Sequence, residues 1–199
     1  MSALSTFVTS VRADHDALHD FANRYNSDRG DPGSIASDLV RRVGFQMLVA
    51  VRLMQFGRDL GIPLFGPLMS RLIRHLYAAE IHWEAQIAPG IGIVHGNGLV
   101  IARSAIVGAG CLLFQGVTLG ESMDPDTGVQ GAPTLGRNVH VMPNAVLVGP
   151  ISVGDGTKVQ ANVTLLTSVP DQTSVRAAKP EFVLRTGVPQ RVCPREDAP

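Results

Sequence analysis

The stretch LGRNVHVMPNAVLVGPISVGDGTKVQANVTL, residues 135–165, carries an apolar residue at every sixth position. These positions are Leu135, Val141, Leu147, Val153, Val159 and Leu165. An amphipathic helix repeats about every 3.6 residues and a half-buried strand every second residue, so neither produces a period of six. A period of six is typical of a triangular solenoid, in which each unit supplies one short strand and one corner.

The same period is present nearer the N-terminus, between residues 81 and 117. Its positions are Ile81, Ile87, Ile93, Leu99, Ala105, Cys111 and Val117. The segment Glu121–Ala132 (ESMDPDTGVQGA) separates the two runs and is rich in turn-forming residues, so we predict a loop that projects from the solenoid. The apolar positions predict a mainly β fold, a left-handed parallel β-helix of hexapeptide repeats over residues 80–170. A sandwich of short strands is the alternative.

Residues 1–79 follow a helical period instead. Apolar residues recur at helical spacing in three segments separated by Asp28–Gly33 and Gly61–Pro63, so we predict a small α-helical segment of about three helices. The third segment contains Leu64, Leu68, Leu72 and Leu76. Because a short solenoid needs its open end covered, we expect the last helix to cover it. After Pro170 the period stops, and residues 171–199 are predicted to be a C-terminal extension with little regular structure.

Composition argues against several classes of function. Lys and Arg together number 17, as do Asp and Glu, so no basic excess points to a nucleic-acid partner. The most apolar stretch, Phe45–Phe56, is interrupted by Arg52 and is too short to span a membrane. Cys111 and Cys193 form no metal-binding pair, and Cys111 is predicted to be a small core residue. We therefore expect a cytoplasmic protein.

Six histidines are candidates for chemistry. His15 and His19 lie four residues apart on the first predicted helix, a spacing compatible with metal binding, but no third ligand accompanies them in the sequence. We therefore interpret both as surface residues. His82, His95 and His140 lie in the solenoid at separations that do not match an 18-residue turn, so we do not expect them to stack. The sequence thus predicts no bound metal.

His95 lies in the segment Ile93–Gly98 (IVHGNG), where small, flexible residues flank it at a predicted corner. A neutral imidazole there can accept the proton of a hydroxyl as a general base. Glu80 precedes His95 by fifteen residues, which is close to one turn. Its carboxylate is therefore a candidate to orient the imidazole.

The segment from Glu80 to Pro170 resembles the serine acetyltransferase branch of the hexapeptide acyltransferases. The resemblance rests on the motifs Glu80-Ile81-His82, Val94-His95-Gly96, Gln115-Gly116-Val117-Thr118-Leu119-Gly120, Ala132-Pro133-Thr134-Leu135-Gly136 and Ser168-Val169-Pro170-Asp171. It implies an O-acetyltransferase that takes acetyl-CoA as donor substrate and assembles as a homotrimer or a dimer of trimers, with active sites between neighbouring prisms. It also implies His95 as the general base and Glu80 as the acidic residue that steadies it.

The resemblance further implies four positions that contact the CoA donor. They are Gly120, Pro143, Lys158 and Ala161. Lys158 is expected to meet a phosphate, and a backbone N–H near Gly120 to steady the oxyanion. Pro143 has no N–H, so a donor contact expected at that position is lost.

The chain departs from the serine enzymes at three positions that hold the amino acid. Val94 stands where they carry Asp, and Gly131 and Ala132 stand where they carry an Arg-His pair. Charge-assisted hydrogen bonds contribute about 1.5–3 kcal/mol each, so losing two or three should remove on the order of two to four powers of ten in selectivity. We therefore expect an acceptor hydroxyl other than free L-serine, such as that of a sugar or a small biosynthetic intermediate.

Two alternatives stay open. A serine O-acetyltransferase of cysteine biosynthesis would acetylate L-serine despite the missing groups. The residues Glu196–Pro199 argue against a partner sulfhydrylase, because the tails of such enzymes usually end in isoleucine. A non-catalytic hexapeptide scaffold would lose nothing measurable when His95 is replaced by alanine.

Overall fold

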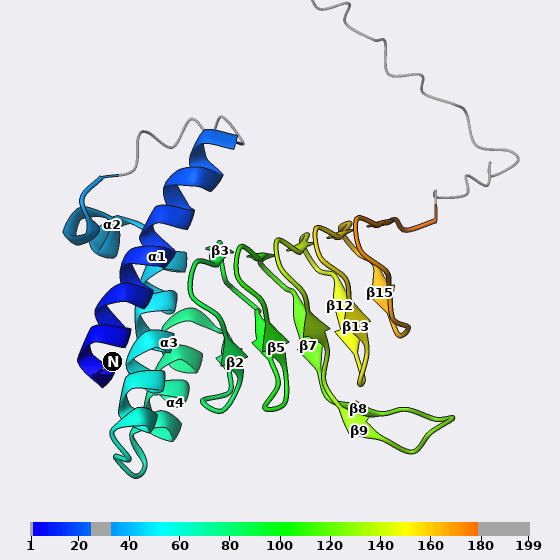
Figure 1. Ribbon diagram of the computed structural model, residues 1–199, viewed down its shortest axis with the longest axis horizontal. Helices are drawn as coiled ribbons and strands as arrows, with labels where there is room; N and C mark the ends of the chain where they lie inside the picture. The colour runs from blue at the N-terminus through cyan, green and yellow to red at the C-terminus, as the bar shows by residue number, and fades with distance from the viewer. Residues whose placement is uncertain (1, 25–32, 179–199) are drawn as a thin grey trace, which may run out of the picture.

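The computed structural model describes residues 2–24 and 33–178. Within them, four helices precede the β-region: α1 (Ala3–Arg24), α2 (Ile35–Arg41), α3 (Val43–Asp59) and α4 (Phe65–Tyr77). The helices gather at one end of a stack of β-coils, as Figure 1 shows. The predicted turn at residues 28–33, apart from Gly33, and Cys193 and the tail from residue 179 lie outside the described residues.

The β-region is a triangular parallel solenoid of about five turns, as predicted. Sheet A contains β1 (Glu80–Ile81), β4 (Val100–Ile101), β7 (Thr118–Gly120), β12 (Val146–Val148) and β15 (Thr164–Leu165). Sheet B contains β2 (Gln86–Ile87), β5 (Ile106–Val107), β10 (Thr134–Leu135) and β13 (Ser152–Val153). Sheet C contains β3 (Gly92–Val94), β6 (Leu112–Phe114), β11 (His140–Val141), β14 (Lys158–Val159) and β16 (Ser174–Val175). The chain visits A, B and C in turn, and β16 lies beyond the predicted end of the solenoid at Pro170.

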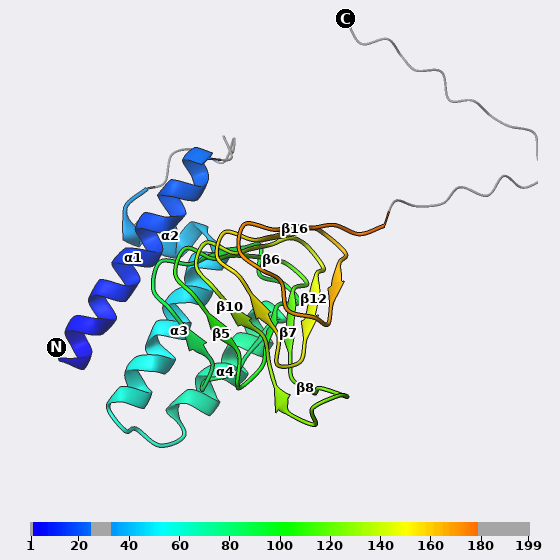
Figure 2. The same cartoon turned by 45° about the vertical axis from the view of Figure 1, so that its right-hand side comes forward.

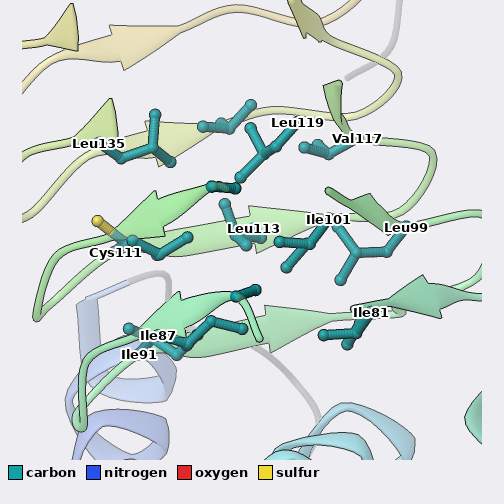
Figure 3. Close-up of a cluster of buried hydrophobic side chains, with 14 of the residues drawn as sticks. Ile81, Ile87, Ile91, Leu99, Ile101, Cys111, Leu113, Val117, Leu119 and Leu135 are labelled. Atoms are coloured by element: carbon teal, nitrogen blue, oxygen red, sulfur yellow. The ribbon is translucent and has the colours of Figure 1, made fainter. Parts of the chain in front are cut away.

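The six-residue period slips once. Ile81 pairs with Ile101 twenty residues later, whereas Leu147 pairs with Leu165 eighteen residues later. The prediction assumed that the six-residue period continues without a shift from Ile81 to Val117. This was wrong between Leu99 and Val117, where each predicted position lies two residues before the inward-facing residue of the strand. All thirteen predicted positions are nevertheless buried, because both sets of side chains face the prism interior (Figure 3).

Cys111 is one of these core residues, as predicted. Its side chain is fully buried, and its Sγ lies 3.1 Å from the carbonyl oxygen of Gly136. Burial raises the pKa of the thiol to about 11. Cys111 is therefore a protonated packing residue rather than a nucleophile.

The predicted loop at residues 121–132 projects from the prism as an antiparallel hairpin, β8 (Ser122–Met123) and β9 (Gln130–Gly131) (Figure 1). Leu119 pairs with Leu147 twenty-eight residues later, so the hairpin adds ten residues to the usual eighteen. At its turn, one carboxylate oxygen of Asp124 accepts hydrogen bonds from the backbone N–H and the hydroxyl of Thr127. The hairpin leaves the prism between sheets A and B.

The open end of the prism is covered by α3 and α4, beside the first coil in Figure 2. Met47, Leu48 and Ile73 join the prism interior in one apolar core. The approach is close: a side chain at Gly44 would place its Cβ 1.9 Å from the carbonyl oxygen of Ile93. The last helix, α4, therefore covers the open end as expected, and α3 covers it as well.

The second predicted helix is divided at Arg42, whose backbone is extended (φ −117°, ψ 102°). The apolar spacing of Leu39, Val43 and Met47 runs through the break, so the sequence contained no sign of it. Arg42 is held there by its Nε, which donates to Asp38 Oδ1 at 2.9 Å. The result is a short α2 that lies against the start of α3.

The leucines of the third predicted helix face away from the core. Leu64, Leu68, Leu72 and Leu76 are 47–71% exposed, whereas Ser70 and Ile73 of α4 face the prism. We call these four residues the leucine row. Large exposed apolar patches are uncommon on soluble monomers, so the row is an unusual feature of this surface.

Candidate active site

His95 lies on an enlarged corner of the prism, between β3 and β4. The two extra residues of the first turn fall in this corner, where His95, Gly96 and Gly98 all have positive φ (67°, 66° and 70°). Residues other than glycine rarely adopt this conformation, and where they do the strain is often associated with function. The corner thus carries the histidine outward from the regular prism outline.

The corners between sheets C and A stack directly on one another and form one edge of the prism, which we call the C–A edge. Along it, the N–H groups of Gly98, Gly116, Asn144 and Asn162 donate to the carbonyl oxygens of Ala78, Asn97, Gln115 and Pro143, respectively. The edge therefore carries His95, Pro143 and Ala161 on three of its four stacked corners, and Gln115 on the corner after that of His95. Three of the residues predicted from the resemblance share one line along the molecule.

Glu80 lies at the same edge, in the coil next to the helices. It begins β1, and its N–H donates to the carbonyl oxygen of Leu99 at 2.8 Å, immediately after the His95 corner. The carboxylate is half exposed, and its Oε1 lies 2.6 Å from Nη2 of Arg74 at the C-terminal end of α4. The predicted acidic residue thus has a guanidinium partner that the sequence analysis did not anticipate.

His82, two residues beyond Glu80, belongs to the recognised motif but was assigned no role. Its ring stacks on Trp83, and its Nδ1 accepts the N–H of Glu84 at 3.1 Å, so the neutral ring carries its proton on Nε2. Burial lowers the pKa of His82, and the nearby carboxylates, Glu84 first, act in the opposite direction without offsetting it. The ring is therefore held neutral beside Glu80 as a hydrogen-bond donor.

The outward face of sheet A is uncharged beyond the first coil. Strand pairing aligns Glu80 with Val100, Thr118, Val146 and Thr164. A second row contains Ala102, Gly120 and Val148, which are all partly buried. Gly120 lies in this row next to the hairpin, and Lys158 lies on sheet C, three residues before Ala161. The predicted donor contacts are thus distributed over the C–A edge and its two flanking sheets.

Gln115 occupies the C–A edge between the corners of His95 and Pro143. Its Oε1 is buried and has no hydrogen-bond partner among the described residues. A buried acceptor without a partner is costly, because it has given up its contacts with water. The atom is therefore ready to accept a hydrogen bond from a bound molecule, a role that sequence position alone did not reveal.

The predictions about the histidines had different outcomes. His82 directly follows β1, His95 lies on the C–A edge and His140 lies in β11, so the three do not stack, as expected. The interpretation of His15 as a surface residue was wrong, because it is 8% exposed and its Nε2 lies 3.1 Å from Asp38 Oδ2. Asp38 comes from α2, 23 residues later in the chain, so no local spacing in the sequence relates it to His15.

The solenoid and its six-residue repeats are those of the hexapeptide-repeat transferases. The bacterial transferase hexapeptide family (six repeats) matches residues 132–167. A serine acetyltransferase of Synechococcus elongatus is 38% identical over 148 residues, covering 73% of this chain and 59% of that protein. A serine acetyltransferase of Helicobacter pylori is 34% identical over 120 residues, covering 59% of this chain and 67% of that protein. Serine acetyltransferase isoform 3 of Entamoeba histolytica, solved in complex with cysteine, aligns with a TM-score of 0.73 and 26% identity, covering 92% of this chain and 64% of that chain.

The chain therefore belongs to the serine acetyltransferase-like branch of the hexapeptide acyltransferases. It spans about three fifths of the length of the Synechococcus elongatus relative.

These relatives overturn the expectation that the acceptor is not free L-serine and favour the serine O-acetyltransferase alternative. That expectation assumed that the side chains at positions 94, 131 and 132 all face the acceptor. Ala132 is 6% exposed, however, and belongs to the apolar core, so its position offers no side chain to a pocket. Arg74 meanwhile brings a guanidinium to the site from α4, a helix outside the motifs that carried the argument.

No helix among the described residues is both long enough and apolar enough to cross a membrane.

Proposed function

We propose that this protein is a serine O-acetyltransferase, which transfers the acetyl group of acetyl-CoA to the hydroxyl of L-serine. The observation that carries the proposal is the enlarged corner bearing His95, next to Glu80 and Arg74, in a chain whose relatives are serine acetyltransferases. The corner supplies a base, the carboxylate an orienting group, and the guanidinium a partner for an amino-acid carboxylate.

In the proposed mechanism, His95 takes the proton of the serine hydroxyl while the oxygen attacks the thioester carbonyl carbon of acetyl-CoA. The tetrahedral intermediate then collapses, the carbon–sulfur bond breaks, and the departing sulfur receives the proton from His95. Glu80 orients the imidazole and stabilises its charged form. A backbone N–H near Gly120 is the candidate to stabilise the oxyanion.

The donor is proposed to lie along the C–A edge and the uncharged face of sheet A. Pro143 and Ala161 offer backbone there, and Lys158 is the candidate for a phosphate contact. Gln115 Oε1 is the acceptor for an N–H of the bound donor or acceptor, because it is buried without a partner among the described residues. An extended CoA molecule reaches several coils at once, which matches the spread of these residues.

The deciding experiment measures release of free CoA with a thiol reagent in the presence of L-serine, homoserine, hexoses and nucleotide sugars. We expect L-serine to give the highest kcat/KM. Faster release with a sugar than with L-serine would contradict the proposal, and no release with any acceptor would favour the scaffold alternative.

Arg74 is proposed to hold the carboxylate of L-serine. Replacing it with alanine should raise KM for L-serine roughly 10- to 150-fold, the equivalent of one charge-assisted hydrogen bond, with a smaller effect on KM for acetyl-CoA. Arg71→Ala, on the same helix and also exposed, is the matched control. Steady-state kinetics with each substrate varied separately make the distinction. Equal changes in both KM values would assign Arg74 a structural role instead.

The proposed assembly is a homotrimer with active sites between prisms, which pair through the leucine row into a dimer of trimers. The support is the uncharged outer face of sheet A and the exposure of all four leucines. The double substitution Leu68→Glu and Leu72→Glu should halve the mass of the assembly, because it places charges in an apolar contact. Light scattering coupled to gel filtration measures this, with Arg71→Glu as control. An unchanged mass would contradict pairing through the row.

A further inference from the structure

The helical region contains a convergent group of metal-binding atoms outside the active site. Among the described residues, His15, His19 and Asp38 form the one group of three or more histidine, cysteine or acidic side chains whose ligand atoms could hold an ion together. His15 and His19 lie one turn apart on α1, and Asp38 comes from α2. All three ligand atoms lie within 4.8 Å of one another.

Hydrogen bonds alone do not satisfy this arrangement. His15 Nε2 faces Asp38 Oδ2 at 3.1 Å and His19 Nε2 at 3.4 Å. If His15 carries its proton on Nε2 and donates it to Asp38, the same N–H would also have to be the hydrogen-bond donor to His19. If His15 Nε2 is instead unprotonated and accepts from His19, its lone pair faces the carboxylate oxygen of Asp38, which is also an acceptor. One cation at the centre would satisfy all three atoms at once.

The distances also suit a particular class of ion. Zinc binds imidazole nitrogen at about 2.0–2.1 Å in tetrahedral geometry, which places neighbouring ligand atoms about 3.3 Å apart. The two contacts of His15 Nε2, at 3.1 and 3.4 Å, bracket that value. A pair of histidines at i and i+4 on one helix is a recurrent zinc-binding arrangement, and two imidazoles with one carboxylate suit zinc and similar divalent metals.

The surroundings hold the third ligand in place. Asp38 is 2% exposed, and its Oδ1 accepts Arg42 Nε at 2.9 Å. Its Oδ2 accepts the N–H of Gly33 at 3.1 Å and faces His15 with its other lone pair. Burial would raise the pKa of Asp38, but the hydrogen bonds from Arg42 and Gly33 outweigh it and keep the pKa below its ordinary value. The carboxylate is therefore ionised, as a metal ligand must be. Outer partners of this kind orient ligands in established metal sites.

We propose that His15, His19 and Asp38 bind a divalent transition metal, with Zn²⁺ preferred, and that the ion ties α2 to α1. The ring of His15 also contacts Phe45 in the first turn of α3, with centroids 5.4 Å apart. The neighbouring Gly44 packs on Ile93, at the base of the His95 corner. The ion therefore holds the part of the helical cap that supports this corner.

The test uses the full chain, stripped of metal with a chelator and titrated with Zn²⁺ against a chromophoric competitor, and with Co²⁺ followed by its visible absorption. We expect one equivalent to bind per chain and the thermal midpoint to rise with Zn²⁺. His19→Ala should weaken binding at least 100-fold and abolish the rise. His19 is only partly buried, so this variant should remain folded, which circular dichroism will check. His75→Ala, on an exposed histidine, is the matched control.

Two outcomes would overturn the proposal. If the wild-type chain takes up no stoichiometric Zn²⁺, the three residues are a hydrogen-bonded cluster and nothing more. If His19→Ala binds Zn²⁺ as tightly as wild type, the ion sits elsewhere. Neither outcome depends on acetyl transfer, so failure here leaves the proposed function unaffected.

Discussion

Replacing His95 with alanine is expected to lower kcat for acetyl transfer by about 10²–10⁴-fold, the usual contribution of a general base. The reason is that the hydroxyl of the acceptor is a weak nucleophile until its proton is removed. His95 is the histidine that the enlarged corner carries outward on the C–A edge. Release of CoA with L-serine as acceptor measures the loss.

The variant should still bind acetyl-CoA, because the proposed donor contacts lie on other corners and sheets. His75→Ala, which removes an exposed histidine from α4, should keep full activity. A His95→Ala enzyme with activity within threefold of wild type would remove His95 from the chemistry.

Replacing Asp14 with alanine is expected to lower the free energy of unfolding by about 3–5 kcal/mol, because it leaves a buried guanidinium without its counter-ion. The side chains of Asp14 and Arg52 are each 1% exposed. Arg52 donates to both carboxylate oxygens of Asp14, at 2.7 and 3.0 Å, and to the carbonyl oxygens of Ile87 and Ala88. Asp14 also accepts the N–H of Gly90 at 2.8 Å. This ion pair therefore joins α1 and α3 to the first coil of the prism.

Urea denaturation followed by circular dichroism measures the change, and Asp16→Ala on the exposed side of α1 should stay within about 0.5 kcal/mol of wild type. The double variant Asp14→Ala and Arg52→Met should cost less than the sum of the two single changes, because it removes the uncompensated charge. A loss below about 1 kcal/mol for Asp14→Ala would show that water reaches Arg52 once the carboxylate is gone.

Arg52 shows which features of a buried charge can be inferred from the sequence and which cannot. In the sequence it is a charge that interrupts an apolar stretch, and that is enough to argue against a membrane span. Its partner is 38 residues away on another helix. No local pattern links the two, because the link is made only when α1 and α3 pack side by side on the prism.

The candidate active site likewise contains residues that the sequence predicted and residues that only the structure revealed. The Ile93–Gly98 segment already predicted an exposed histidine at a corner, because small, flexible residues flank His95 there. Arg74, Gln115 and His82 became candidates only through their surroundings in the structure: an ion pair, a buried acceptor without a partner among the described residues, and a stacked ring. The mistaken exclusion of L-serine arose in the same way, since it assigned substrate contacts to positions 131 and 132 by alignment along the chain, without knowing which way those residues face.

The solenoid, its projecting loop, the helical segment and the candidate base could all be predicted, because each depends on a repeat or a turn encoded within a few residues. Folding in three dimensions was needed to reveal the two-residue insertion at the His95 corner, the outward face of the leucine row, the Asp14–Arg52 ion pair and the proximity of His15, His19 and Asp38. A helix can present any of its faces to the core, and contacts between elements depend on how those elements are packed. Those relations exist only in three dimensions.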